Sequence, residues 1–326
     1  MASKNVLVTG IGGNVGQGII RNIRKTKFDI NVVGTNIEDF SAGNHLCDTF
    51  YKVPYAVADN YITEIIKIVE SEQIDLIIPS TDYEIYYLSL HQNKVPCKIV
   101  VSDEQTASNY LDKYLTFCHL NKHGLAFATS CLPSTYANQF DEFILKPRKG
   151  RGSRGIQINP TLIEGFSDEE YMIQELHKGP EITTAFYVNK NNELHGFITL
   201  DRVLENGTTT HCKVVTQYDE KLKYLLEKII SVSTIKGSAN LQSIVNSKGE
   251  IMPFEINCRI SGTNSIRANF GFEDVKYTLE EWLYETKLSQ PNIKKGIATR
   301  ILMDVIYENA TDFSDIKDNS THPYIY

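Results

Sequence analysis

The stretch from Lys236 to Gly271, KGSANLQSIVNSKGEIMPFEINCRISGTNSIRANFG, predicts two strands joined by a tight turn. We expect the strands over about 238–245 and 250–257, with Asn-Ser-Lys-Gly at 246–249 as the turn. The other signals in the chain can be arranged around this hairpin.

Side-chain alternation gathers polar groups on one face of the hairpin. Asn240 and Gln242 share a face, and Glu255 and Asn257 share a face from which Phe254 points away. A two-residue turn sets Gln242 opposite Glu255, and a four-residue turn keeps the same faces together. A carboxylate and several amide oxygens would then meet, a donor set that suits Mg²⁺ beside substrate phosphates. An ordinary edge hairpin with a polar outer face is the open alternative.

The segment PFEINCRISGT at 253–263 resembles the E-I-N-P-R-x-S-G signature of the ATP-grasp superfamily. The resemblance is to carbamoyl-phosphate synthetase large-subunit-like proteins and single-unit carboxylate–amine ligases, with Cys258 where proline is usual. It implies ATP with Mg²⁺ or Mn²⁺ as cofactors. It also implies a metal held by Gln242, Glu255 and Asn257, and catalytic roles for Arg259, Lys146 and Asn257.

Composition bounds the class of protein. With 41% hydrophobic and 22% charged residues over 326 positions, the chain predicts a globular protein of one to three domains. A net charge of −7 without a basic block disfavours nucleic-acid binding, and no apolar run reaches membrane-spanning length. MASKNVLVTG runs directly into a strand, unlike a signal peptide. The six cysteines form no CxxC pair, so we expect a reducing, cytoplasmic location without zinc or disulfides.

The first hundred residues alternate between short apolar strands and helices. This alternation predicts a small doubly wound parallel sheet, a Rossmann-like domain. The expected strands cover 5–9, 30–34, 75–79 and 97–101, and the expected helices 15–24, 62–69 and 85–92. Two further helices are expected over 103–124.

The sequence TGIGGNVG at 9–16 supports a rival hypothesis. It matches the TGxxGxxG loop of NAD(P)-dependent epimerases and reductases, whose glycines let the backbone approach a pyrophosphate. Glu38 could hold a ribose in such a site. The Tyr-x-x-x-Lys of these enzymes occurs only at Tyr224 to Lys228, within an amphipathic helix, which disfavours the hypothesis. After the strand at 75–79, PSTDYE offers Asp82 and Glu84, which could meet an amine or merely cap a helix.

A second signal, EFILKPRKGRGSRGI at 142–156, predicts a strand followed by a glycine-rich loop. Backbone N–H groups, a hydroxyl and cations of such a loop can surround a polyphosphate, although the sequence is not a P-loop. The ATP-grasp resemblance implies that Lys113 and Lys146 contact phosphates and that the loop closes over them. The loop residues implied to bind are Gly150, Gly152, Ser153 and Gly155. A flexible basic hairpin tip is the alternative.

A third signal, YMIQELHKGPEITTAFYV at 171–188, predicts one strand that ends near Glu175 and another that begins at Glu181. The resemblance implies an adenine hinge formed by Gln174, Glu175 and Leu176. It also implies that Glu181 accepts hydrogen bonds from the ribose hydroxyls, since a carboxylate can accept two. Without the resemblance, Glu181 is a charge at a strand edge.

Other polar groups are weaker candidates. Arg202 and Lys213 could contact phosphate or substrate. Ser261, Thr263 and Arg267 follow the metal segment, where they could steer a carboxylate or cap a helix. Further elements are expected as a loop over 127–140, a strand over 195–203, a helix over 274–284 and a last strand over 297–307.

Together the signals predict an α/β and α+β fold, with a Rossmann-like pre-ATP-grasp domain ahead of a two-subdomain ATP-grasp fold. The expected domains are 1–110, then 111–190 as the small subdomain with the glycine-rich loop, and 191–326 as the large subdomain with the metal site.

The implied enzyme is an ATP-dependent ligase that activates a carboxylate as an acyl phosphate and joins it to an amine, releasing ADP and phosphate. Its partners would be small-molecule carboxylate and amine substrates, an amino acid among them. Neither nucleic acid nor a membrane is expected, and a homodimer is a family-level expectation. Two rivals stay open: an NAD(P)-dependent epimerase or reductase, and a catalytically silent nucleotide-binding protein.

Overall fold

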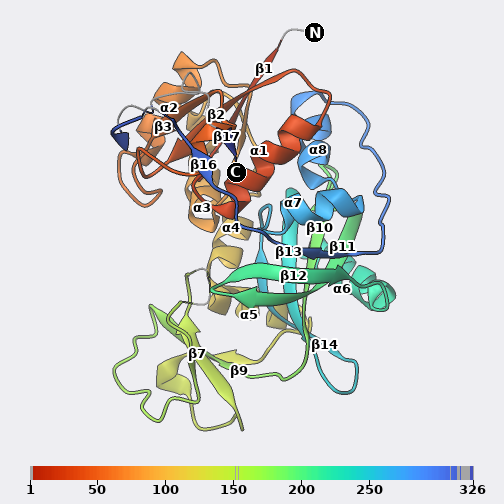
Figure 1. Cartoon of the computed structure of the whole chain (residues 1–326). Coiled ribbons are helices and arrows are strands. Elements are labelled where there is room, and N and C mark those ends of the chain that lie inside the picture. The colour runs from red at the N-terminus through yellow and green to blue at the C-terminus, as the bar shows by residue number, and fades with distance from the viewer. Residues whose placement is uncertain are drawn as a thin grey trace.

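The computed structural model describes residues 3–150, 152, 154–308, 310–313, 316 and 324–325. Three main sheets of five, four and six strands follow one another along this part of the chain (Figure 1). The four-stranded sheet forms the separate lobe at the bottom of Figure 1, and helices cover the other two sheets. The mixed α/β and α+β fold that the sequence predicted is confirmed.

The five-stranded sheet is parallel throughout, with strand order β3-β2-β1-β4-β5. Its strands are β1 (Lys4–Val8), β2 (Ile30–Asn36), β3 (Thr49–Lys52), β4 (Leu76–Ile78) and β5 (Lys98–Ile99). The helices around it are α1 (Asn14–Lys25), α2 (Tyr61–Ser71) and α3 (Asp82–Leu90), with short η1 (Asn44–Leu46) and η2 (Gln92–Lys94). Val6, Leu7 and Val8 are fully buried because helices cover both faces of a parallel sheet. β3 was not indicated by the sequence because it carries no apolar run.

The strand order reverses between β1 and β4, so the loops that follow these two strands meet at the carboxyl edge of the sheet. The backbone N–H of Ser80, after β4, donates to the Thr9 hydroxyl, after β1, at 3.1 Å. Open α/β sheets bind ligands at this edge, and here it faces the rest of the chain.

Two helices, α4 (Glu104–Leu111) and α5 (Lys113–Lys122), follow as predicted. The Asp112 carboxylate caps α5 by accepting the backbone N–H groups of Tyr114 and Leu115 at 2.9 and 3.2 Å. The cap fixes the start of α5, where the helix carries a predicted phosphate-binding lysine.

The four-stranded sheet is antiparallel, with strand order β6-β9-β7-β8. Its elements are β6 (Ser130–Cys131), η3 (Pro133–Thr135), β7 (Phe143–Pro147), β8 (Gln157–Ile158) and β9 (Tyr171–Glu175). Phe143, Leu145 and Ile173 form its small core. β7 and β9 confirm two predicted strands that flank the glycine-rich loop and the hinge.

The six-stranded sheet is antiparallel, with strand order β14-β13-β10-β11-β12-β15. Its strands are β10 (Glu181–Val188), β11 (Leu194–Glu205), β12 (Thr208–Val214), β13 (Gly237–Val245), β14 (Ile251–Asn257) and β15 (Ile297–Thr299). Helix α6 (Asp219–Ser231) packs on one face through Leu222, Leu226 and Ile229. β10 pairs with β11 and β13, so this strand, which lies before the boundary predicted at 190, belongs to the six-stranded sheet.

The predicted hairpin is β13 and β14, and it sets Gln242 opposite Glu255 and Asn240 opposite Asn257 as expected. Its loop has neither of the predicted lengths. Val245 pairs with Ile251, and the loop is closed by the N–H of residue 246, which donates to the carbonyl of residue 250 at 3.0 Å. Gly249 adopts a φ of +73°, a conformation that suits glycine.

A β-bulge at Phe254 restores the predicted register. The pairing shifts by one residue between Gln242 and Ser243, so Phe254 is an extra residue in β14. The bulge also overturns one prediction. Phe254 was expected to point away from Glu255, but both residues line the same pocket. A bulge turns consecutive side chains toward one side, which strict alternation does not allow.

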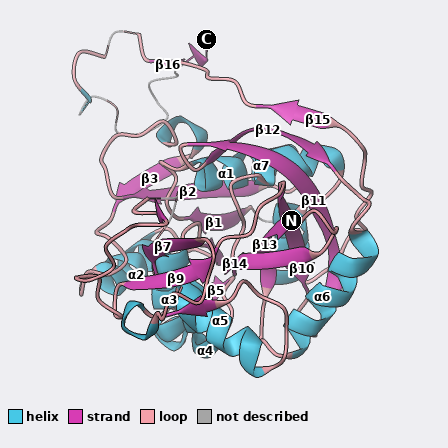
Figure 2. Cartoon of the chain, turned by 90° about the horizontal axis from the view of Figure 1, so that it is seen from below, coloured by secondary structure: helices cyan, strands magenta, loops and turns pink. Residues whose placement is uncertain are grey.

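The C-terminal part differs more from the prediction. The expected helix at 274–284 is α8 (Asp274–Thr278) followed by a π-helical turn, Leu279–Leu283, after the short α7 (Asn264–Arg267) and η4 (Ala268–Phe270). The expected strand at 297–307 is two strands: β15 at the edge of the six-stranded sheet, and β16 (Val305–Ile306), which pairs with β17 (Tyr324–Ile325) at the top of Figure 2. Among the described residues, no helix has the length and apolarity to cross a bilayer.

Candidate active site

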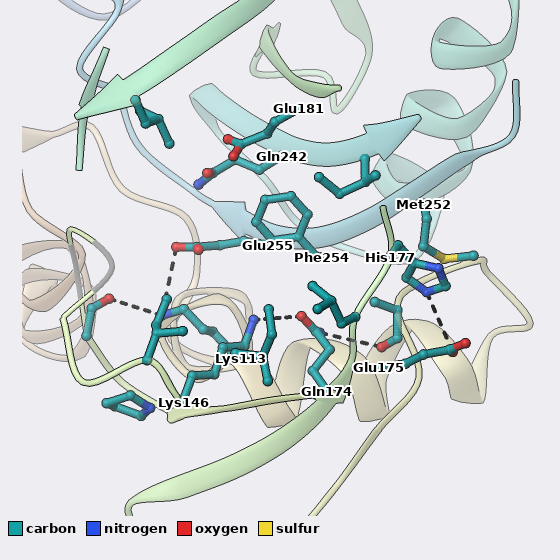
Figure 3. Close-up of a pocket in the computed structure, with 18 of the residues that line it drawn as sticks. Lys113, Lys146, Gln174, Glu175, His177, Glu181, Gln242, Met252, Phe254 and Glu255 are labelled. Carbon is teal, nitrogen blue, oxygen red and sulfur yellow. Dashed lines mark hydrogen bonds and ion pairs between the residues drawn. The ribbon is translucent and has the colours of Figure 1, made fainter. Parts of the chain in front are cut away.

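A pocket is lined by residues of the four-stranded sheet, the six-stranded sheet and α5 (Figure 3). The predicted residues that line it are Lys113, Lys146, Gly150, Gly152, Gln174, Glu175, Leu176, Glu181, Gln242 and Glu255. Gly155, Asn257 and Arg259 are described but lie outside this lining. Ser153 falls outside the described residues.

The rest of the lining is mostly apolar. It consists of Ala128, Ile144, Pro147, Ile156, Leu204, Ile244, Met252 and Phe254, with Arg154 and His177 as polar members. Apolar walls with a few polar groups at defined places suit a planar ligand that carries a charged end. Except for Ala128 and Leu204, these residues lie within the three stretches that carry the signals in the sequence, but nothing in those stretches showed which of their side chains would face a pocket.

Lys146 on β7 is the most buried cation of the pocket, with 5% of its surface exposed. Its Nζ donates to Gln174 Oε1 at 2.7 Å and lies 5.8 Å from the centre of the Phe254 ring. Burial lowers the pKa of the Lys146 ammonium to about 8, although the nearby Glu255 carboxylate favours the charged form. An ammonium that lacks a carboxylate in hydrogen-bond contact is well suited to receive an anionic ligand.

Lys113, the first residue of α5, connects the glycine-rich loop to the metal hairpin. Its Nζ donates to the carbonyl of Gly150 at 3.0 Å and lies 3.8 Å from Glu255 Oε1. The opposite side of the loop touches the β11–β12 hairpin: a Cβ added to Gly207 would lie 2.6 Å from the Cα of Gly152. The loop is therefore held at Gly150 by the Lys113 side chain and lies against the β11–β12 hairpin at Gly152, and both glycines line the pocket.

The three predicted metal ligands lie together on the hairpin. Gln242 Nε2 donates to Asn257 Oδ1 at 3.2 Å, and Asn257 Nδ2 donates to Glu255 Oε1 at 3.1 Å. Burial alone would raise the pKa of the Glu255 carboxyl, but Lys113 and Lys146 hold it below its ordinary value. Glu255 is therefore ionised at neutral pH.

This donor set fits a hard divalent cation that arrives with phosphate oxygens. It offers one carboxylate and two amide oxygens, and Mg²⁺ is commonly held by one or two carboxylates plus substrate phosphates. No group of three or more His, Cys, Asp or Glu side chains with metal-binding geometry occurs in the described part of the chain.

Glu181, predicted to accept the ribose hydroxyls, is paired with Arg202 on β11. The Nη2 of Arg202 donates to Glu181 Oε1 at 2.6 Å and also to Gln242 Oε1 at 2.6 Å. The weak candidate Arg202 therefore contacts two residues that line the pocket, although it is not itself part of the lining. Lys213, the other weak candidate, is 59% exposed and forms an ion pair with Asp201 at 3.0 Å.

Arg259 and Asp82 form an ion pair. Arg259 Nη2 and Nε donate to Asp82 Oδ2 at 2.8 and 3.1 Å, so a residue of the metal segment is joined to the start of α3. Arg259 was predicted to meet phosphate, and Asp82 an amine. In this structure each is the partner of the other, and the pair links the five-stranded sheet to the hairpin.

Glu84 is a structural residue, and its prediction as an amine contact is corrected. It forms a capping box with Thr81, whose hydroxyl accepts the Glu84 N–H at 3.3 Å, and Glu84 Oε2 accepts the Thr9 hydroxyl at 2.7 Å. Burial raises the pKa of the Glu84 carboxyl. Glu84 therefore takes part in capping α3, as the alternative proposed, but it is buried rather than solvated.

The predicted adenine hinge joins β9 to β10. The N–H of Glu175 donates to the Thr129 carbonyl at 2.8 Å, and the N–H of Leu176 donates to the Glu142 carbonyl at 2.9 Å. Neither N–H is therefore available to an adenine edge in this structure. The next N–H belongs to His177, which also lines the pocket.

Arg267 is buried and cannot steer a carboxylate substrate. It has no exposed surface, pairs with Asp274 on α8, and donates from Nη1 to the hydroxyls of Ser261 and Thr263 at 2.7 and 2.9 Å. These residues hold the turn after the predicted metal segment in place through the Arg267 guanidinium. The alternative of a helix cap is not seen, because Thr263 stands at the N-cap position of α7 without a side-chain cap hydrogen bond.

The glycines of TGIGGNVG let the loop pack on its own chain. A Cβ added to Gly16 would lie 2.7 Å from the Gly10 carbonyl oxygen, and one added to Gly12 would lie 2.9 Å from the Asn36 amide. Tyr224 and Lys228 lie on α6, where Lys228 Nζ is 5.4 Å from the Tyr224 ring centre. Packing within the chain therefore accounts for Gly12 and Gly16 without a dinucleotide, whereas a Cβ on Gly13 would make only an ordinary contact at 3.6 Å.

Two family models match the chain. Residues 6–101 match the family described as PylC-like, N-terminal domain, and residues 110–263 match the family described as ATP-grasp domain. The chain contains an ATP-grasp domain. The glycine-rich loop, the predicted adenine hinge and the β13–β14 hairpin all lie within this ATP-grasp domain. No curated protein matches the sequence.

Solved structures share the fold of the ATP-grasp domain and its N-terminal neighbour. N5-carboxyaminoimidazole synthetase from Staphylococcus aureus, complexed with ADP, has a TM-score of 0.76 at 15% identity over 92% of this chain and 82% of that chain. Carboxyaminoimidazole ribonucleotide synthase from Aspergillus clavatus, complexed with ATP, has a TM-score of 0.73 at 17% identity over 90% and 81%.

A third structure is the biotin carboxylase domain dimer of 2-oxoglutarate carboxylase from Hydrogenobacter thermophilus, in complex with MgADP, ADP and bicarbonate. Its TM-score is 0.70 at 16% identity over 90% of this chain and 73% of that chain. At these identities the likeness shows the fold alone.

Proposed function

We propose that the protein is an ATP-dependent ligase that activates a carboxylate as an acyl phosphate and joins it to an amine, releasing ADP and phosphate. The observation that carries the proposal is the meeting of Lys113, Lys146 and Glu255 around one pocket. They come from α5, β7 and β14, and this convergence accompanies an ATP-grasp family match. The structural relatives described with ADP, ATP or MgADP support the same nucleotide.

The pocket suggests how the nucleotide lies. The apolar walls would contact the base, with the His177 N–H in place of the predicted Leu176 N–H as the hinge donor. Glu181 would accept ribose hydroxyls, and Lys113 and Lys146 would bind phosphate oxygens. The glycine-rich loop, held at Gly150 by Lys113, would cover the phosphates.

Catalysis would rest on positioning and electrostatics. A bound Mg²⁺ or Mn²⁺ supplies charge that offsets the negative charge developing during phosphoryl transfer. Gln242, Glu255 and Asn257 would hold it. The substrate carboxylate would attack the γ-phosphate, and the amine would then displace phosphate from the acyl carbon. Lys146 would stabilise the transferring oxygens, and no side chain needs to act as a nucleophile.

The finer identity of the substrates and the assembly are also proposals. We propose a small carboxylate and a small amine, an amino acid among them, on the likeness to the ligase relatives. The biotin carboxylase relative is described as a dimer with bicarbonate, which supports a homodimer here. A cytoplasmic location rests on cysteine usage alone.

Release of ADP tests the proposal. We expect Mg²⁺-dependent ADP release that rises in a screen of carboxylate and amine pairs. Glu255→Gln should lower the rate of ADP release by roughly 100-fold or more, because the metal would lose its one carboxylate ligand. Glu250→Gln is the matched control, since Glu250 lies at the exposed tip of the same hairpin and accepts from Asn246 Nδ2 at 2.7 Å. Equal ADP release in the Glu255 variant and the control would contradict the metal assignment.

A further inference from the structure

Arg202 joins two acceptors of the pocket with one guanidinium. Its Nε and Nη2 donate to Glu181 Oε1 at 3.0 and 2.6 Å, and Nη2 also donates to Gln242 Oε1 at 2.6 Å. The Arg202 side chain is 12% exposed, so it is held in place beside the pocket. Figure 3 shows Glu181 and Gln242 next to each other on the side of the pocket away from Lys146.

The proposed function assigns both of these acceptors to ligand. Glu181 is proposed to accept the ribose hydroxyls, and the Gln242 amide oxygen to hold the metal. The Gln242 amide is also fixed from its other end, because its Nε2 donates to Asn257 Oδ1 at 3.2 Å. The Gln242 amide oxygen therefore faces Arg202, and the amide nitrogen faces Asn257 on β14.

Electrostatic repulsion limits whether a divalent cation can bind the Gln242 amide oxygen while Arg202 is in contact with it. A guanidinium and a divalent cation repel each other strongly when both lie at bonding distance from one oxygen in a partly buried site. A polyphosphate between them removes that repulsion, and a guanidinium binds phosphate oxygens through two parallel N–H groups. Lys113 and Lys146 lie near Glu255 as well, so other cations already neutralise the single carboxylate of the predicted metal site.

We propose that Arg202 is a positioning residue that keeps a divalent cation from binding at Gln242 and Glu255 without nucleotide, and that moves onto the phosphates when the cation arrives with them. This inference rests on the proposed function. In this inference the metal–nucleotide complex is the form that binds. Arg202 then has two opposite effects: it weakens binding of the metal alone and strengthens binding of the nucleotide.

The test uses two probes on the purified full chain. Mn²⁺ alone is titrated by electron paramagnetic resonance, and Mg²⁺ with a non-hydrolysable ATP analogue is titrated by calorimetry. In Arg202→Gln we expect Mn²⁺ to bind about threefold tighter or more, because a buried positive charge is gone. We expect the analogue to bind roughly tenfold weaker, because a charged phosphate contact is lost. A purely structural loss would weaken both.

Two further variants sharpen the result. Arg202→Lys keeps the charge without the two-point contact, so Mn²⁺ binding should stay weak while the ATP analogue loses part of its affinity. Lys213→Gln removes the same charge from the neighbouring strand, where Lys213 pairs with Asp201 away from the pocket, and should change neither affinity.

The outcomes separate this inference from the proposed function. Unchanged or weaker Mn²⁺ binding in Arg202→Gln, or unchanged binding of the analogue, would overturn the role of Arg202 while leaving the ligase proposal in place. A wild-type protein that binds no Mg²⁺–analogue complex would overturn both.

Discussion

At the scale of the residue, Lys146 shows how surroundings set chemistry. The side chain is buried, and its hydrogen-bond partner is the Gln174 amide. Burial therefore dominates and lowers the pKa of the ammonium from 10.5 to about 8. The group stays charged at neutral pH but is ready to lose its proton at mildly basic pH. A bound polyphosphate would favour the charged form again.

We therefore expect nucleotide affinity to fall as the pH rises through about 8, because binding must then restore a proton to Lys146. Calorimetric titration of the Mg²⁺–analogue complex between pH 6.5 and 9.5 measures this. Lys146→Gln should bind roughly tenfold weaker at pH 7 and lack the step. A flat wild-type profile, or the same step in the variant, would contradict the assignment.

The same pKa shift predicts a change in the stability of the ligand-free protein. Between about pH 8 and 10.5 the unfolded chain holds the Lys146 proton that the folded chain has lost. The contribution of Lys146 to the free energy of unfolding should therefore become more favourable to the folded state as the pH rises through this window. Denaturant unfolding of the wild type and of Lys146→Gln compares the two slopes.

At the scale of the element, the start of α5 is set by Asp112. Its carboxylate caps the helix and forms an ion pair with Arg148 at 2.8 Å, which ties α5 to the end of β7. Both Lys113 and Lys146 depend on this junction for their positions, since one begins α5 and the other lies on β7.

Asp112→Ala should lower the free energy of unfolding by roughly 3–5 kcal/mol, because it removes the cap and leaves Arg148 without its partner. Asp112→Asn keeps an acceptor for the backbone N–H groups and should cost less. Urea denaturation followed by circular dichroism gives both values. Equal losses in the two variants would show that the cap contributes little.

The hairpin shows what the sequence could predict and what it could not. The pairing of Gln242 with Glu255 follows from the parity of side chains along strands. The three-residue loop and the bulge at Phe254 each shift the register by one, and their effects cancel. The bulge has no sequence signal, so the place of Phe254 in the pocket was missed.

The partners of the charged groups were also beyond prediction. Lys113 and Lys146 could be proposed from a family resemblance, because they lie at fixed places relative to its motifs. The contact of Arg202 with Glu181, and that of Asp82 with Arg259, depend on how separate elements pack. The distance along the chain between Asp82 and Arg259 leaves no local pattern that could reveal their pairing.

At the scale of the whole molecule, the five-stranded sheet and the hairpin region share one core. Val275 and Leu279, from the segment after the hairpin, pack with Ile19 and Ile23 of α1 (Figure 1). The N-terminal domain is thus fixed against the ATP-grasp domain rather than tethered to it. The Asp82–Arg259 pair lies at this junction, at the carboxyl edge of the parallel sheet.

Asp82→Asn should lower the rate of ADP release by roughly tenfold and leave nucleotide affinity within about twofold, because Arg259 loses its anchor while the nucleotide pocket is untouched. The matched control is Lys98→Gln. It breaks the exposed Lys98–Glu285 pair, another contact between the N-terminal sheet and the later chain. A loss of nucleotide affinity in Asp82→Asn that matches its loss of rate would contradict this role.

The measurement that tests the central claim most directly is a thermal-shift titration of the wild type and of Glu255→Gln against ATP with Mg²⁺, ADP, NAD⁺ and NADPH. A ligand that binds only the folded state raises the midpoint by mass action. We predict that ATP with Mg²⁺ stabilises the wild type and that most of this effect is lost in Glu255→Gln. Stabilisation by a nicotinamide nucleotide alone would contradict the account and place the working site at the glycine loop of residues 9–16.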